Sequence, residues 1–370
     1  MFWTRSGDHS DRLEKMGKAR EQKNTGRYRV LWGFLFVALN LAVIGWTAYR
    51  EFHVKERPTA FSLGEHGIAY LLAALLCLAV IFLTETVKLL LTAQSLGEKM
   101  SFRTAFETVA LGKYYDSITP TGGGGQPFQI YWLHLRGYSA RESAVIPAIA
   151  FVTRQLATVI TALIVFVCQR GIEPETIRFP AYAGLFFCAI PPTVEIAFSL
   201  RPKAIKMLLA GILKLGAKIH LVKDYEGSLE TVIGTLTQYQ DGFQLISRRK
   251  SLLIPLMGLS FLCRAALCSI PFFILRALGC PAGYLRIFCM TVYIYAAVTL
   301  IPTPGNSGVS EGAFYLVFSE VGSSGTFWAM LLWRLICYYS LLLIGLLFLR
   351  RQMKVFEESR KKDNNSHKKE

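Results

Sequence analysis

The chain has 370 residues, of which 52% are hydrophobic, and its formal net charge is +16. Such a charge would suit a nucleic-acid-binding protein, but the Lys and Arg residues alternate with long apolar runs, which argues against that class. Several of these runs reach the roughly 20 apolar residues that cross a bilayer. We therefore expect an all-α polytopic membrane protein that has no nucleic-acid partner.

In chain order, a basic cytoplasmic arm at residues 1–28 comes first. The run after it begins too late in the chain for a cleaved signal peptide. Residues 201–250 are predicted to form a cytoplasmic helical loop, and residues 351–370 a basic cytoplasmic tail. The six predicted spans cover about 29–49, 68–93, 143–168, 179–200, 251–275 and 326–349.

The Lys and Arg residues predict the orientation of these spans. Residues 1–29 contain eight of them, residues 201–250 nine, and residues 350–370 eight. By contrast, residues 169–178 and 276–325 contain two each. Because cytoplasmic loops of membrane proteins are enriched in Lys and Arg, we expect both termini to be cytoplasmic.

Two further apolar stretches, 104–135 and 284–322, are each interrupted at the middle by Gly and Pro. The interruptions read ITPTGGGG and IPTPGNSG. Limbs of about 10 to 17 residues are short for separate crossings, so we predict re-entrant hairpins. The flanking charges predict that the first hairpin enters from the cytoplasm and the second from outside.

This order predicts an inverted repeat, with halves at about 29–168 and 179–349. Each half would contain two spans, a re-entrant broken-helix hairpin and a further span, as in many secondary transporters. The tips also resemble each other, since TPTGGGG begins at Thr119 and TPGNSG at Thr303. The alternative is a pair of flexible interfacial loops between partly inserted helices.

The glycine run indicates a binding site. Irregular backbone at membrane depth is tolerated only where it is buried in protein or lines a wet cavity. Half-helices that start near Gln126 and near Ser307 to Ser310 would present free N–H groups to an anion. The run lacks the GK[ST] ending of a phosphate-binding loop, so nucleotide binding is not expected.

Four basic residues fall within predicted spans. Lys88 is near the predicted cytoplasmic end of its helix, where we expect it to snorkel to the interface. Arg154, Arg264 and Arg334 are deeper, at an insertion cost of roughly 2.5–3.5 kcal/mol each. Such residues usually face a cavity, and here they are predicted to hold a lipid phosphate.

A structural alternative is that these arginines form ion pairs that lock the helix bundle, with Glu311, Asp116 or Glu195 as partners. Glu311 follows the second tip and can cap the returning helix. It can also receive the amine of a zwitterionic or cationic lipid. The eight cysteines form no CxxC pair and the six histidines no HExxH pair, so we expect no metal site, no cofactor and no catalytic residue.

The segments TPTGGGGQPFQIYWLHLRGYSARESAVIPAIAFVTRQ and TLIPTPGNSGVSEGAFY resemble the lysylphosphatidylglycerol synthase transmembrane region family. This is the flippase-like domain of multiple peptide resistance factors, which also occurs in stand-alone bacterial proteins. The resemblance implies a flippase-like transmembrane domain at 29–350, in the bacterial plasma membrane. With the buried charges, it places the lipid path at Asp116, Thr119, Thr121, Gly122, Gly123, Gly124, Gly125, Gln126, Gln129, Arg154, Arg264, Pro304, Gly305, Ser310, Glu311 and Arg334.

The function implied is lipid transport, in which an anionic or aminoacylated phospholipid such as lysylphosphatidylglycerol moves between leaflets, in support of antimicrobial peptide resistance. Two alternatives stay open. One is a phosphatidylglycerol lysyltransferase, whose soluble catalytic domain has no room after Arg350. The other is a non-transporting membrane subunit that recruits a soluble transferase through residues 201–250. Membrane phospholipids are the expected partners, and a homo-oligomer is compatible with the sequence.

Overall fold

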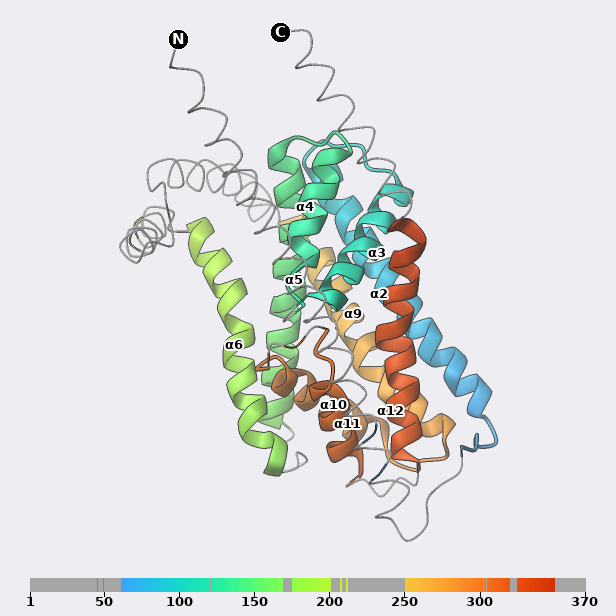
Figure 1. Cartoon of the computed structure of the whole chain (residues 1–370). Helices are drawn as coiled ribbons and strands as arrows, with labels where there is room; N and C mark the ends of the chain where they lie inside the picture. Colours follow the sequence, from blue (N-terminus) through green and yellow to red (C-terminus); the bar gives the residue numbers. More distant parts are fainter. Residues whose placement is uncertain are drawn as a thin grey trace, which may run out of the picture.

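A computed structural model describes most of the apolar part of the chain (Figure 1). The first predicted span, the 201–250 loop and both terminal segments lie outside the described residues, apart from Gly45, Tyr49, Met207 and Gly211. The described part is helical and contains no strand, which confirms the all-α prediction. The described residues are 61–119, 122–168, 175–200 (side chains only to 193), 250–301, 303, 305–319 and 325–349, together with Gly45, Tyr49, Met207 and Gly211.

Four helices are long and apolar enough to cross a membrane, and they confirm four of the predicted spans. The span predicted at 179–200 is also helical, as α6 (Glu175–Leu200), but α6 is not among those four. Three prolines interrupt its sequence. The four long helices are α2 (Gly67–Ser95), α5 (Ala140–Cys168), α9 (Lys250–Ala277) and α12 (Thr326–Arg334), which continues through the π-helix η2 (Leu335–Tyr339) to Leu349.

Both predicted hairpins are present as pairs of short helices with an irregular tip between them. The first pair is α3 (Phe102–Ile118) and α4 (Gly125–Leu135). The second pair is α10 (Tyr284–Val298) and α11 (Val309–Ser319). Figure 1 shows α3 and α4 near one end of the long helices, and α10 and α11 toward the other.

Local sequence explains where the first hairpin bends. The Ser101 hydroxyl accepts a hydrogen bond from the Thr104 N–H at 3.1 Å and caps the start of α3. The helix ends at Ile118, and Thr119 is extended, because the residue before a proline, here Pro120, is disfavoured in the helical conformation. Pro127 lies in the first turn of α4, where the missing N–H is not needed for the helix.

The two tips touch each other. The Gly305 N–H donates to the Thr119 carbonyl at 3.3 Å, and the Tyr338 hydroxyl donates to the Ser117 carbonyl at 3.2 Å. Gly305 has a φ of +56°, and a Cβ there would overlap the Tyr338 ring. Glycine is therefore required at this contact for both conformation and space.

The packing is compatible with the predicted repeat, in which α2 and α9 would be equivalent. These two helices pack along each other, and α10 packs against both α6 and α9. The two hairpins approach from opposite ends, as the repeat requires (Figure 1). The inverted repeat itself stays a prediction.

Candidate functional site

A cavity of about 500 Å³ lies where the two tips meet the long helices. Its wall includes Gly122 and Gly123 from the first tip and Asn306 from the second. The helices α2, α3, α5, α6, α9 and α10 contribute the rest, together with Cys337 of η2 and Leu341 after it. A second cavity of about 200 Å³ adjoins it and shares Gly122 and Asn306 with it.

The lining of these cavities is strongly basic. In the larger cavity the basic groups are Lys113, Arg154 and Arg264, and no carboxylate is among the described lining residues. The smaller cavity contains Lys113 again, with Arg334 and a single carboxylate, that of Asp116. Because the walls have low dielectric constant, this excess of positive charge favours an anion inside.

Arg264 is the most informative of these groups. Only 8% of the residue is exposed, and its guanidinium lies over the Tyr295 ring at 5.1 Å from the centroid. Within the described part of the chain it makes no ion pair, and its Nε has no hydrogen-bond partner. A buried charge without an acidic partner is costly, so the geometry leaves Arg264 available to an anion in the cavity that it lines.

Arg154 reaches the same cavity from α5. A third of its side chain is exposed, and Nη1 lies 3.8 Å from Oε2 of Glu85. This separation is too long for a hydrogen bond. Arg154 therefore lies near its counter-ion without a direct hydrogen bond to it, and it lines the cavity.

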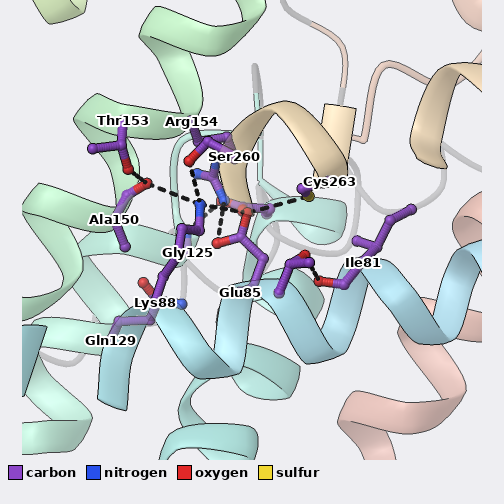
Figure 2. A network of polar contacts seen from close by, with 12 residues as sticks. Ile81, Glu85, Lys88, Gly125, Gln129, Ala150, Thr153, Arg154, Ser260 and Cys263 are labelled. Carbon is purple, nitrogen blue, oxygen red and sulfur yellow. Dashed lines mark hydrogen bonds and ion pairs between the residues drawn. The ribbon is translucent and has the colours of Figure 1, made fainter. Parts of the chain in front are cut away.

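A buried network on α2 fixes the position of Glu85 (Figure 2). The Lys88 ammonium donates to Glu85 Oε1 at 3.1 Å, to Ser260 Oγ at 3.2 Å and to the Ala150 carbonyl at 3.3 Å. Cys263 Sγ also contacts Glu85 at 3.5 Å. Two other helices, α5 and α9, thus supply partners for a single lysine.

The prediction that Lys88 snorkels to the interface is wrong. The residue is completely buried. Its three acceptors satisfy all three ammonium hydrogens, and withdrawal of Lys88 would leave Glu85 without its closest counter-ion. The spacing of Glu85 and Lys88, three residues apart on one helix, was a signal for this pair in the sequence.

Arg334 is paired, in contrast to Arg264. Its Nη2 donates to Glu311 Oε2 at 2.6 Å and to the Asn306 carbonyl at 3.3 Å. Glu311 is 2% exposed and also accepts the Gly308 N–H at 2.7 Å. This geometry is the locking ion pair of the structural alternative, and it includes the predicted helix cap. It joins the second tip to α12, directly before the π-helix.

The first tip is held by its own polar groups. Asp116 Oδ1 accepts the Gly125 N–H at 2.7 Å, and Thr119 Oγ1 accepts the Gly124 N–H at 2.9 Å. Gln129 Nε2 donates to the Thr108 carbonyl at 3.3 Å and links α4 to α3. Protein acceptors thus already bind backbone amides at the start of α4 and, through Glu311, at the start of α11. The arginine side chains are therefore the stronger donors for an anion.

The predicted site residues therefore divide into three groups. Those that line a cavity are Asp116, Gly122, Gly123, Arg154, Arg264, Gly305, Ser310 and Arg334. Those that support a tip or begin its helix are Thr119, Gly124, Gly125, Gln126, Gln129 and Glu311. Thr121, Pro304 and the side chain of Glu195 lie outside the described residues.

Sequence reasoning missed five described residues that line both cavities, namely Lys113, Tyr295, Asn306, Cys337 and Leu341, of which the first three are polar. Lys113 had a usable signal, since it precedes Asp116 by three residues on the helix that leads to the first tip. Tyr295 and Asn306 had none, because neither residue type is unusual in an apolar helix or a turn.

Replacement of Gly125 by alanine is expected to destabilise the first hairpin by roughly 1–3 kcal/mol, the usual cost of overpacking. The new Cβ would overlap the Asp116 carboxylate and the Gly112 carbonyl. The matched control is Gly312→Ala in α11, where a Cβ meets open space. Thermal unfolding in detergent should show a lowered Tm for Gly125→Ala alone, and a wild-type Tm would contradict the close approach.

Comparisons with known proteins agree with this architecture. One relative is a UPF0104 membrane protein from Archaeoglobus fulgidus, 26% identical over 281 residues, which cover 74% of this chain and 84% of that protein. Residues 30–345 match the model of the family described as Lysylphosphatidylglycerol synthase TM region. The match spans both hairpins and the four long helices, apart from the last four residues of the final helix. The chain thus belongs to the lysylphosphatidylglycerol synthase TM region family.

Proposed function

We propose that the protein is a lipid translocase that moves an anionic or aminoacylated phospholipid between the leaflets of its membrane. The observation that carries this proposal is the larger cavity, with Lys113, Arg154 and Arg264 and no carboxylate among its described lining residues. A membrane subunit with a purely structural role has no need for an unpaired arginine at this depth, given its insertion cost.

The broken helices at the two tips favour transport over static binding. Broken helices that meet at a binding site are typical of transporters that expose the site alternately to the two sides. Here the Gly305 N–H of the second tip donates to the Thr119 carbonyl of the first tip at 3.3 Å, and beside them the Tyr338 hydroxyl of η2 donates to the Ser117 carbonyl of α3 at 3.2 Å. Such a contact can open without the loss of a charged pair.

An aminoacylated headgroup would find a second binding group close by. Asp116 lines the smaller cavity, as Arg334 does, and its Oδ1 accepts the Gly125 N–H. We propose that a phosphate binds Arg154 and Arg264 while an ammonium group approaches Asp116. Glu311, considered for this role from the sequence, is instead occupied by Arg334 and Gly308.

The proposed location is the bacterial plasma membrane, with both termini in the cytoplasm. The support is the distribution of Lys and Arg, which is high in 1–29, 201–250 and 350–370. Residues 201–250 remain a proposed docking segment for a soluble transferase, and self-association is compatible with the proposal.

The proposal is tested by reconstitution into liposomes with fluorescent phospholipids, whose outer-leaflet fraction is quenched by dithionite. We expect the protein to speed exchange of phosphatidylglycerol and lysylphosphatidylglycerol over protein-free vesicles, and to move phosphatidylcholine less. If all three lipids exchange at the protein-free rate, the protein is not a translocase. If the protein speeds the exchange of phosphatidylglycerol but not of lysylphosphatidylglycerol, the proposed ammonium site at Asp116 is contradicted.

A further inference from the structure

An apolar groove lies beside the basic cavity. It has a volume of about 290 Å³ and is formed by α2, α3 and the final helical segment after η2. All of its described lining residues are apolar: Leu75, Leu78, Ala79, Phe82, Leu83, Phe102, Phe106 and Ile344. Polar substrates and headgroups find no partner there.

The groove adjoins the cavity. Leu78 lines both of them, and Ile81, one turn further along α2, lines the cavity. The Lys113 ammonium, which lines both basic cavities, lies 5.9 Å from the centroid of the Phe82 ring in the groove wall. A positive group and a hydrocarbon surface are therefore direct neighbours.

The groove has an ordered aromatic wall. The Phe106 ring contacts Phe82 at 5.6 Å, Phe102 at 6.3 Å and Phe348 at 5.9 Å between centroids. These contacts bring together α2, α3 and the end of the last helix. The groove is consequently a feature of the packed bundle rather than of one helix surface.

We propose that this groove binds an acyl chain of the same lipid whose phosphate occupies the arginine cavity. The inference rests on the proposed function and adds to it the site of the hydrocarbon tail. The substrate is a single amphiphile with an anionic headgroup and a hydrocarbon tail, not a water-soluble organophosphate. The tail leaves the bundle between α2, α3 and the last helix, which is the lateral exit of the site.

The first experiment separates a bound substrate from bulk membrane lipid by photo-crosslinking. Phosphatidylglycerol with a diazirine midway along one acyl chain is added to the wild-type protein in phosphatidylcholine nanodiscs, and adducts are mapped by mass spectrometry. We expect adducts on groove residues of α2 and α3. A diacylglycerol with the same diazirine should label exposed positions such as Phe186 on α6, and the groove much less.

Equal labelling of the groove by both probes would show that it holds bulk lipid only, and would overturn the inference. The Arg264→Ala variant checks again whether labelling of the groove depends on the headgroup. With the phosphatidylglycerol probe, the yield of adducts in the groove should fall in this variant, and the yield at Phe186 should not change. These results do not depend on transport. If wild-type protein moves no lipid yet shows headgroup-dependent adducts, the translocase proposal fails and the acyl-chain site stands.

The second experiment fills the groove. Ala79 is exposed and lines it, so Ala79→Trp should reduce lipid exchange several-fold. The matched control is Leu76→Trp on the same helix, which is 65% exposed and lies outside the groove lining. Wild-type exchange in both variants would refute the acyl-chain site while leaving the translocase proposal intact.

Discussion

Replacement of Arg334 by alanine is expected to lower the free energy of unfolding by about 3–5 kcal/mol, the usual effect of breaking a buried ion pair from one side. Glu311 would lose its 2.6 Å partner while remaining 2% exposed. The Asn306 carbonyl in the second tip would lose the same donor. Thermal unfolding in detergent should show a markedly lower Tm.

The double variant Arg334→Ala, Glu311→Gln distinguishes this lock from a binding role. Because glutamine carries no charge, the stranded carboxylate disappears and much of the Tm should return. Arg286→Ala is the control, since Arg286 is an exposed basic residue on α10 and surface changes usually stay within about 0.5 kcal/mol. A Tm for Arg334→Ala equal to that of Arg286→Ala would show that the pair does not hold the tip.

Replacement of Arg154 or Arg264 by alanine is expected to abolish most lipid exchange with little loss of stability. Arg264 has no acidic partner in the described part of the chain, so its removal strands no charge. Removal of Arg154 leaves Glu85 with Lys88 at 3.1 Å. Each variant loses charged hydrogen bonds to the phosphate, worth about 1.5–3 kcal/mol or more than tenfold in binding.

Lysine variants refine this test. Arg154→Lys and Arg264→Lys keep the charge but lose the planar fork that binds two phosphate oxygens, so we expect intermediate exchange rates. Exchange and Tm are measured on the same preparations. If a stable Arg154→Ala, Arg264→Ala double variant exchanges lipid at the wild-type rate, the cavity lined by these arginines is not the anion-binding site.

Much of the architecture follows from local sequence. Four apolar runs became long helices because about 20 apolar residues suit a bilayer span. The tips at 119–124 and 299–308 follow from Gly and Pro, which weaken or end a helix wherever they occur. The arginines at 154, 264 and 334 were recognisable as charges inside apolar helices because their neighbours in the chain are apolar. These features depend on residues close together in the chain.

The roles of the buried charges were decided by tertiary structure. Arg264 and Arg334 look alike in sequence, each within an apolar helix, yet among the described residues only Arg334 of the two has a carboxylate within reach. Lys88 is internal rather than interfacial because Ser260, 172 residues away, supplies one of its acceptors. The free energy of a buried charge depends on the partners within a few ångströms of it. Local sequence therefore determined where the charges lie along the helices, and only the packing of α2, α5, α9 and the two tips decided which of them are neutralised and which remain for a ligand.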